Sequence, residues 1–133
     1  MRVLVSGASG LIGTALCESL VADGDEVVRL VRKSPAGPGE VFWNPARGEL
    51  DLGAVAGFDA VVHLSGAGIG DRRWSDRRRQ LIVDSRVQST QLLADRIAAV
   101  QHKPEVFISG SAIGYYGIRG DLVVETDGPA HPP

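Results

Sequence analysis

The sequence predicts an α/β fold, a doubly wound parallel sheet in a three-layer α/β/α arrangement. Short apolar runs of strand length alternate with segments of helical period, an order that favours a parallel sheet. Clusters of glycine and serine follow three of these runs, at residues 6–13, 65–68 and 109–117. Because parallel strands end at one edge of a sheet, the clusters are expected to lie together there. Residues 1–133 fit a single domain.

The first cluster follows a short strand and precedes a helical pattern. After Val3-Leu4-Val5 comes Ser6-Gly7-Ala8-Ser9-Gly10-Leu11-Ile12-Gly13. Strand, glycine turn and helix are the parts of a dinucleotide-binding unit of a Rossmann-type fold, with a purely structural turn as the alternative. We expect Gly7 to permit the tight turn, Gly10 to bring backbone N–H groups close to a pyrophosphate, and Gly13 to let helix and strand pack closely. No lysine follows Gly13, which argues against the phosphate-binding loop of nucleotide hydrolases.

The first helix is predicted to run from about Leu11 to Asp23 and to end at Gly24, as at a C-cap glycine. Its core-facing side is expected to consist of Ile12, Ala15, Leu16, Ser19 and Leu20. Cys17, the single cysteine, is expected to be an ordinary buried residue of this helix. One cysteine forms no disulfide framework, and no metal-ligand cluster is expected.

Two cations, Arg32 and Lys33, follow the second predicted strand at residues 26–31. Enzymes that prefer NAD place an Asp or Glu here, about 20 residues after the glycine turn, to bind the ribose 2′-hydroxyl. Two cations suit a 2′-phosphate instead, so NADP is the expected cofactor in preference to NAD. A solvated basic strand end is the alternative interpretation.

The middle of the chain is predicted to hold two strands and an abbreviated crossover. Residues 41–43 are a candidate third strand before the Asn44-Pro45 turn, with Trp43 expected in packing contacts, and residues 47–58 are too glycine-rich for a long helix. Residues 59–64 form the clearest interior strand, since a near-continuous apolar run suits a sheet covered on both faces. His63 lies within this strand, so a hydrogen-bonded structural histidine is favoured over a catalytic one.

A longer helix is predicted from its N-cap Ser75 to about Val100. The run of arginines around Trp74 also contains Asp71 and Asp76, so it is interpreted as mainly a solvated helix start rather than a nucleic-acid patch. The predicted core-facing stripe consists of Thr90, Leu93, Ile97 and Val100. Arg86 falls on the same stripe and therefore needs a partner or a site to point into.

Another interior strand is predicted at residues 105–109, after Lys103-Pro104 breaks the helix. It leads into Ser109-Gly110-Ser111-Ala112-Ile113-Gly114-Tyr115-Tyr116-Gly117, the third group of hydroxyls and glycines at a strand end. Residues 121–133 show no helical period and no capping element, so the chain is expected to be the N-terminal part of a longer pattern.

Composition restricts the class of protein and its partners. A net charge of −2 and 44% hydrophobic residues describe a globular domain without a global field for nucleic acid or membrane. No apolar run is long enough to span a bilayer, and the first strand begins too early for a signal peptide, so the cytoplasm is the expected compartment. A small-molecule substrate of unassigned identity is expected, and the oligomeric state is left open.

Segments 6–13, 59–66 and 111–117, in this order, resemble the extended short-chain dehydrogenase/reductase superfamily. Closer likeness to its atypical nucleoside-diphosphate-sugar epimerase-like branch (NAD-dependent epimerase/dehydratase) comes from Arg32-Lys33, Arg73-Trp74, Ser85-Arg86 with Thr90, and Tyr115-Tyr116-Gly117. The resemblance implies that the pyrophosphate contacts Gly7, Ser9, Gly10, Leu11 and Ile12. It places Arg32 on the 2′-phosphate and Ser111 at the reacting carbonyl or hydroxyl. It also implies that Leu64, Ser65 and Gly66 contact the nicotinamide side of the cofactor.

The sequence departs from the superfamily pattern at catalytic positions. The superfamily's helix asparagine is Arg86 here, four residues before Thr90. The chain has no Tyr-x-x-x-Lys pair, and its only local candidate, Tyr115-Tyr116-Gly117-Ile118-Arg119, has arginine where lysine belongs. Arginine stays protonated and is no titratable partner for a tyrosine. We therefore expect cofactor binding without turnover of sugar nucleotides or simple carbonyls.

Two functions remain open from the sequence. The first is an NADP(H)-binding domain of an oxidoreductase- or epimerase-like protein, with hydride transfer at a carbon bearing oxygen. The second is a non-catalytic NADP(H)-binding sensor or partner module. A methyltransferase is disfavoured, because that fold usually places an acidic residue after the second strand, where Arg32 stands.

Overall fold

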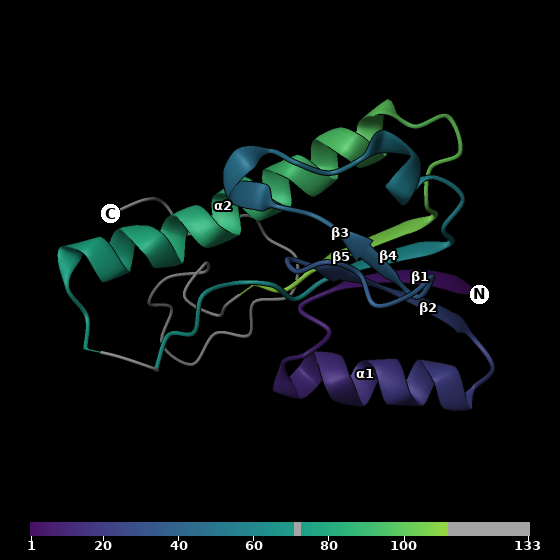
Figure 1. Ribbon diagram of the computed structural model, residues 1–133, viewed down its shortest axis with the longest axis horizontal. Helices are drawn as coiled ribbons and strands as arrows, with labels where there is room; N and C mark the ends of the chain where they lie inside the picture. The colour runs from purple at the N-terminus through teal and green to yellow at the C-terminus, as the bar shows by residue number, and fades with distance from the viewer. Residues whose placement is uncertain (71–72, 112–133) are drawn as a thin grey trace, which may run out of the picture.

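The computed structural model describes residues 1–70 and 73–111 as a parallel sheet with helices on both faces (Figure 1). In chain order the elements are β1 (Arg2–Ser6), α1 (Leu11–Ala22), β2 (Glu26–Val31), β3 (Glu40–Phe42), the short 3-10 helices η1 (Pro45–Arg47) and η2 (Leu52–Val55), β4 (Ala60–His63), α2 (Asp76–Ala99) and β5 (Val106–Ser109). The strand order is β3-β2-β1-β4-β5, and every pairing is parallel. The chain starts at the centre, winds outward to β3 and returns to β4, which confirms the predicted Rossmann-type fold.

Both faces of the central strands are buried, as their apolar runs predict. In β1, Leu4 packs in the core beneath α2, whereas Val3 and Val5 pack in the core beneath α1. Val61 and Val62 of β4 divide between the two cores in the same way. Successive side chains of a strand point to opposite faces, so a strand that is apolar throughout needs cover on both. α1 covers one face, and α2 with η1 and η2 covers the other (Figure 1).

The side of helix α1 that faces the sheet agrees with the predicted side only at Leu16 and Leu20. Its sheet-facing residues are Gly13, Leu16, Cys17 and Leu20. Three predicted core positions are exposed instead, namely Ile12, Ala15 and Ser19. Gly13 approaches Gly7 so closely that an added Cβ would lie 2.1 Å from the Gly7 carbonyl oxygen, and this close packing favours the observed rotation of the helix about its axis. Cys17 is buried, as predicted.

Helix α2 begins where the sequence predicted, because the Ser75 hydroxyl accepts a hydrogen bond from the Arg78 N–H at 3.1 Å. Leu93 and Val100 are buried, and Ile97 packs beside them, as predicted. The same side of the helix also buries two residues that the sequence analysis did not place in the core, Ser89 and Leu92. The first half of α2 extends past the carboxyl edge of the sheet (Figure 1).

The connection from β3 to β4 contains no α-helix, in agreement with its length and glycine content. Trp43 follows β3 directly and is 2% exposed, packed in the core that also contains Leu50 and Val55. Arg96 of α2 donates a hydrogen bond to the Leu50 carbonyl at 2.8 Å and ties the connection to the helix. The packing role predicted for Trp43 is confirmed.

Within residues 1–70 and 73–111, β5 is an edge strand, whereas the sequence predicted an interior one. It is the last strand of the described sheet, and all four of its residues are exposed, including Ile108 at 52%. Within residues 1–70 and 73–111, only β4 pairs with it. An apolar run indicates that a strand favours burial. The run does not indicate which other elements pack against the strand.

We predict that Gly13→Ala destabilises the domain by about 3 kcal/mol or more, the upper range for overpacking. An added Cβ would lie 2.1 Å from the Gly7 carbonyl oxygen and 2.8 Å from the Ala8 Cα, so rigid backbone has to move. Urea denaturation measures the free energy of unfolding. Gly37→Ala is the matched control, because nothing lies within 4 Å of its Cβ, and a change within about 0.5 kcal/mol is expected there. Equal stabilities of the two variants would contradict the assigned contact.

Candidate dinucleotide-binding site

The glycine loop lies at the carboxyl edge of the sheet, between β1 and α1 (Figure 1). Gly7 has φ +71°, a conformation that residues with a Cβ rarely adopt. A Cβ on Gly7 would also lie 2.6 Å from the backbone carbon of Leu64 and 2.8 Å from the nitrogen of Ser65. The predicted tight turn is confirmed, and the same residue brings the loop against the end of β4.

Gly10 and the first turn of α1 form an open surface. Gly10 is the N-cap residue, and a Cβ there would meet only the Gly7 carbonyl oxygen, at 3.3 Å. No side chain caps the helix, and its first turn holds no acidic residue. Unpaired N–H groups and the positive end of the helix dipole therefore lie beside exposed Ser9 and Leu11, an arrangement that suits an anion. A Cβ at position 10 would make one close contact, with the Gly7 carbonyl oxygen, and would otherwise lie on the open side of the loop.

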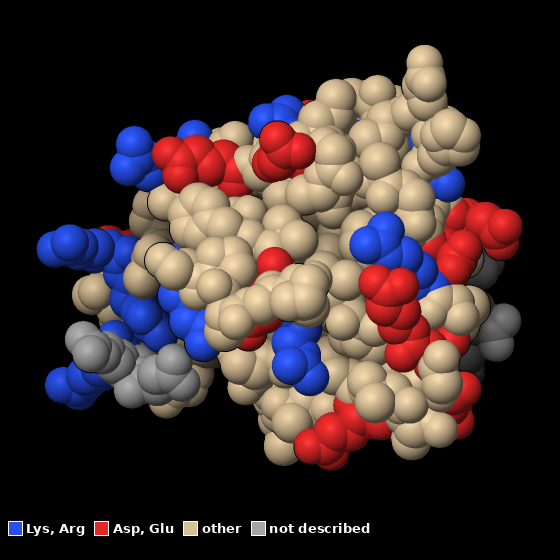
Figure 2. All heavy atoms as spheres, turned by 45° about the vertical axis from the view of Figure 1, so that its right-hand side comes forward, with Lys and Arg blue, Asp and Glu red and all other residues tan. Residues whose placement is uncertain are grey.

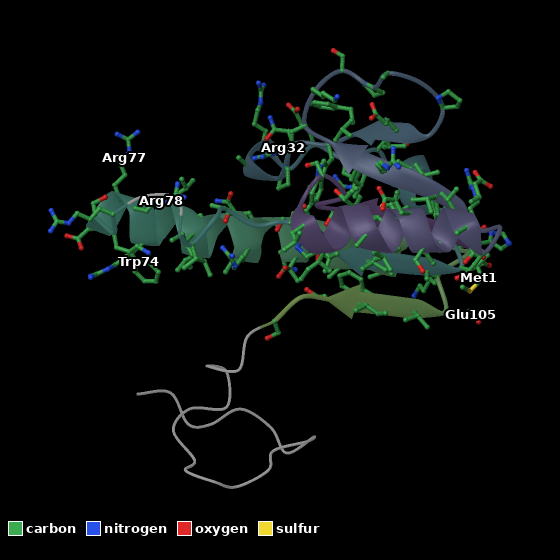
Figure 3. All side chains as sticks on the ribbon, turned by 90° about the horizontal axis from the view of Figure 1, so that it is seen from below. Met1, Arg32, Trp74, Arg77, Arg78 and Glu105 are labelled. Atoms are coloured by element: carbon green, nitrogen blue, oxygen red, sulfur yellow. The ribbon has the colours of Figure 1, made fainter. Side chains whose placement is uncertain are left out.

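Arg32 and Lys33 lie on one side of the glycine loop. They follow β2, which pairs with β1 and ends at the same edge. Both residues are exposed, and Figure 3 shows Arg32 at the end of the molecule where α1 begins. Within the described part of the chain neither forms an ion pair with a carboxylate. Both cations are therefore available to an anion at this edge.

Leu64, Ser65 and Gly66 lie on the other side of the glycine loop. They follow β4, whose pairing with β1 continues as a hydrogen bond of 3.1 Å from the Leu64 N–H to the Ser6 carbonyl. Since β2, β1 and β4 are neighbours in that order, Arg32, the glycine loop and these three residues form a row along the carboxyl edge. A row of this kind matches an extended ligand with an anionic middle.

His63 is a buried structural residue, as predicted from its place inside β4. It is 3% exposed and lies edge-on to the Trp43 ring, with 6.0 Å between the ring centroids. The Ser6 hydroxyl oxygen lies 2.5 Å from its Nδ1, and the Ser89 hydroxyl oxygen lies 3.0 Å from its Nε2. The imidazole thus joins the last residue of β1 to the middle of α2.

The partners of the two hydroxyls set the direction of these hydrogen bonds. Ser89 donates to the Ser85 carbonyl at 2.6 Å, so its oxygen accepts from the Nε2–H of His63. The Ser6 oxygen accepts from the Leu64 N–H at 3.2 Å and donates its proton to Nδ1. A neutral imidazole satisfies every group in this series, and burial lowers the pKa of His63 below its ordinary value. His63 is therefore a fixed link between elements.

The arginines at the start of α2 are only partly the solvated run that the sequence predicted. Figure 2 shows Lys and Arg side chains gathered at the end where α2 begins, and Arg77 points away from the helix in Figure 3. Arg78 is half-buried, however, and donates to the Gly68 carbonyl at 2.6 Å. The indole N–H of Trp74 donates to the Ile69 carbonyl at 2.9 Å. The reason is that a loop outside any strand leaves carbonyls to be satisfied, and long side chains of the helix reach them.

Arg86 lies on the core-facing stripe of α2 and was expected to need a polar partner, and the structure shows hydrogen-bond acceptors for it. Its Nη1 donates to the Ala67 carbonyl and to the Ile82 carbonyl, both at 3.1 Å. The neighbouring Ser85 hydroxyl accepts a hydrogen bond of 3.0 Å from the Ala67 N–H. The loop after β4 is therefore held by α2 through both its carbonyls and its N–H groups.

Ser111 is the last described residue and follows β5 at the same edge. The Gly110 N–H donates to the His63 carbonyl at 2.8 Å, and a Cβ on Gly110 would lie 3.7 Å from the Leu64 side chain. Ser111 is therefore close along the edge to the loop that begins at Leu64, and it is exposed. The predictions on Tyr115, Tyr116 and Arg119 lie outside the described residues.

Sequence reasoning missed the hydroxyls that hold His63 and the loop after β4. Ser6 and Ser89 are buried, at 0% and 1% exposure, and neither was singled out from the sequence. A signal was present in α2, where Ser85, Arg86 and Ser89 interrupt an apolar stripe within about one helical turn. Polar residues on a buried stripe need hydrogen-bond partners, so such an interruption points to a polar contact with a neighbouring element.

Other kinds of site do not compete with the carboxyl edge. Among residues 1–70 and 73–111, no three His, Cys, Asp or Glu side chains are grouped to hold a metal ion. No helix described in these ranges is long and apolar enough to cross a membrane. A shallow depression of about 330 Å³ lies between η2 and the end of α2, at the opposite edge of the sheet, lined in part by Leu52, Ala56, Val100 and His102.

The strand order, the left-handed glycine after β1 and the open N-terminus of α1 define a Rossmann-type domain, the class of α/β protein that holds its ligands at this edge. A family model described as the NAD dependent epimerase/dehydratase family matches residues 3–132. The chain belongs to this family, as its motifs led us to expect.

Three known proteins show the extent of the likeness. An epimerase family protein of Mycobacterium leprae is 44% identical over 123 residues, which are 92% of this chain and 39% of that protein. The crystal structure of human epimerase family protein SDR39U1 (isoform 2) with NADPH has a TM-score of 0.78 at 36% identity, over 97% of this chain and 42% of that one. MoeE5 in complex with UDP-glucose and NAD has a TM-score of 0.72 at 29% identity, also over 97% and 42%. The chain spans 38–42% of the length of the curated relatives it matches here.

We predict that the free energy of unfolding falls as the pH drops below about 6.5, the ordinary pKa of histidine. Burial lowers the pKa of folded His63, so below that pH the unfolded chain binds a proton that the folded chain does not. The contribution is fully present above about pH 6.5 and is lost as the pH falls toward the folded pKa. Urea denaturation from about pH 7 to about pH 5 measures the slope.

His63→Gln should flatten this slope, because the titrating ring is removed. His102→Gln is the matched control, since His102 is exposed and follows α2 at the far edge of the sheet. A slope that survives in His63→Gln but disappears in His102→Gln would show that the wrong histidine has been assigned.

Proposed function

We propose that the chain is the NADP(H)-binding domain of an oxidoreductase- or epimerase-like protein. The observation that carries the proposal is the glycine loop. A Cβ on its Gly7 or Gly13 would lie under 3.0 Å from backbone atoms and is excluded, whereas Gly10 is exposed and a Cβ there would meet one protein atom, the Gly7 carbonyl oxygen, at 3.3 Å. A pyrophosphate at Gly10 would accept hydrogen bonds from the N–H groups of the first turn of α1, where the helix dipole favours negative charge.

The row along the carboxyl edge supports one orientation of the cofactor. Arg32, with Lys33 beside it, would bind the adenosine 2′-phosphate at the end of β2, and Ser9, Leu11 and Ile12 would surround the pyrophosphate at the start of α1. The nicotinamide half would then lie over the end of β4, beside Leu64, Ser65 and Gly66. Among the relatives, the human structure contains NADPH and the MoeE5 structure contains NAD. The choice of NADP(H) for this chain therefore rests on Arg32 and Lys33.

When bound, the cofactor would supply hydride transfer at a carbon that bears oxygen. Ser111 follows β5 beside the end of β4, and its hydroxyl would hydrogen-bond the oxygen of that carbon. The neutral, fully hydrogen-bonded His63 would hold the strand ends under the reacting groups without exchanging a proton. The residues of this chain would thus bind the cofactor, orient its nicotinamide half and polarise the oxygen of the reacting carbon.

A non-catalytic NADP(H)-binding module is the second candidate, favoured by the surroundings of Ser111. Within the described residues, no titratable side chain forms a hydrogen bond with Ser111. Reduction of a carbonyl needs a positioned proton donor for the developing charge on oxygen. Arg86 occupies the position of the superfamily's asparagine and is engaged with the Ala67 carbonyl. Measured turnover of NADPH with ketones, aldehydes and keto-sugars distinguishes the two candidates.

We predict that the chain binds NADPH more tightly than NADH and that Arg32→Ala removes the preference. A charge-assisted contact with the 2′-phosphate contributes about 1.5–3 kcal/mol, or about tenfold or more in affinity. Titration calorimetry with both cofactors measures the ratio. Arg29→Ala is the matched control, because Arg29 is an exposed arginine within β2, away from the strand end. Equal affinities in the unmodified chain, or an unchanged ratio in Arg32→Ala, would disprove the assignment.

We also predict that Gly10→Val abolishes cofactor binding while the domain stays folded. The backbone at Gly10 is extended, with φ −78° and ψ 172°, which valine adopts readily. Its branched side chain would occupy the surface where the pyrophosphate approaches. Circular dichroism reports the fold and calorimetry reports binding. Loss of the fold would make Gly10 a structural residue, and retained affinity would place the pyrophosphate elsewhere.

A further inference from the structure

The loop that follows β4 is held by side chains of α2 and of the segment just before it. Three successive carbonyls of this loop accept hydrogen bonds from three different side chains: Ala67 from Arg86, Gly68 from Arg78, and Ile69 from Trp74. Donors on a rigid helix fix a loop more firmly than water does, because the helix side chains do not exchange. The path of residues 67–69 is therefore set by α2 together with Trp74, which lies just before the helix.

Arg86 approaches the loop at Gly66 and Ala67, and Gly66 is one of the residues proposed to lie beside the nicotinamide half. A Cβ on Gly66 would lie 2.9 Å from the guanidinium carbon of Arg86 and 3.1 Å from each of its two terminal nitrogens. The near-equal distances show that the guanidinium lies with its face toward Gly66. One terminal nitrogen donates to the Ala67 carbonyl, so the same group contacts two successive loop residues. Position 66 has no room for a side chain while Arg86 holds this place.

We infer that Arg86 is a positioning residue that sets the loop at Gly66 for the nicotinamide half of the cofactor. The inference rests on the proposed cofactor site and assigns to Arg86 the control of one half of it. In the row along the carboxyl edge, β4 and its loop lie on one side of the glycine loop, and Arg32 lies on the other side, after β2. A displaced Gly66 therefore alters the surface under the nicotinamide half and leaves the surface under the adenosine half in place.

Two ligands allow the adenosine half and the nicotinamide half of the proposed site to be tested separately. Adenosine 2′,5′-bisphosphate carries the 2′-phosphate and one phosphate of the pyrophosphate, whereas NADPH carries the nicotinamide half in addition. In Arg86→Ala, we expect the affinity for NADPH to fall about tenfold, the effect of one charge-assisted hydrogen bond. The affinity for adenosine 2′,5′-bisphosphate should be unchanged. A residue that only supports the fold would weaken both ligands together and lower the melting temperature.

Matched variants on the same helix test whether the effect belongs to Arg86. Arg79→Ala removes an exposed arginine whose partner is Asp76, at 3.5 Å, and should leave both affinities unchanged. Arg86→Lys keeps the charge and one donor for the Ala67 carbonyl but loses the planar group over Gly66. We expect it to restore part of the NADPH affinity, to within about threefold of the unmodified chain.

Gly66→Ala is an independent way to remove the Arg86 guanidinium from its place against residue 66. The added methyl group should push the guanidinium aside, at little cost to folding because the end of a long side chain moves. In the unmodified background it should weaken NADPH binding by about the same factor as Arg86→Ala. In the Arg86→Ala background it should have no further effect, because the group it displaces is already gone.

Calorimetry with both ligands on the four single variants and the double variant gives a definite outcome. Selective loss of NADPH affinity, with Gly66→Ala and Arg86→Ala not additive, supports the inference. Equal losses for both ligands, no loss in Arg86→Ala, or additive losses in the double variant would overturn it. If the unmodified chain binds neither ligand, the proposed cofactor site itself fails. If it binds the bisphosphate but gains nothing from the nicotinamide half, the inference fails while the adenosine half of the site stands.

Discussion

Three backbone segments meet at Gly7, and the carboxyl edge of the sheet depends on that contact. Gly7 approaches the end of β4 so closely that a Cβ would lie within 2.6–2.8 Å of Leu64 and Ser65. On the other side, Gly13 of α1 packs against the Gly7 carbonyl oxygen, which would lie 2.1 Å from a Cβ on Gly13. Both approaches exist only because these two residues lack side chains. They place the start of α1 at the carboxyl edge of the central strands, where the proposed site requires an open helix N-terminus.

Hydrogen bonds complete what the glycine contacts begin. The series from Leu64 through Ser6, His63 and Ser89 to the Ser85 carbonyl joins β4, β1 and α2 directly beneath the edge. A buried polar series of this kind is favourable only when every member is satisfied, which a neutral imidazole achieves here. The ends of the strands and the middle of α2 are thereby fixed relative to one another. The position of the loop from Gly66 to Ile69 depends on that arrangement, because the loop follows β4 and is hydrogen-bonded to side chains of α2.

The fold and the glycine loop could be predicted from the sequence because their signals are local. Apolar strand runs, Gly7 and Gly24 at positions of left-handed backbone, and the N-cap at Ser75 each depend on residues a few positions apart. The buried side of α1 was predicted only in part, since Leu16 and Leu20 face the sheet as expected but Ile12, Ala15 and Ser19 are exposed. The close approach of Gly13 to Gly7, which hydrophobicity does not reveal, favours the observed rotation. The exposure of β5 in the described part of the chain was also missed, since an apolar run does not reveal which elements cover it.

The sequence by itself determined the Rossmann-type architecture, the glycine turn, the cations after β2 and the structural character of His63. These follow from the period of apolar residues, the backbone freedom of glycine and the order of residues along the chain. The tertiary structure alone decided which side chains complete the edge. Ser6 and Ser89 are 83 positions apart in the chain, yet both contact His63, and Arg86 reaches Ala67 across the β4–α2 connection. Such partnerships depend on how strands and helices pack, and no short stretch of sequence contains that information.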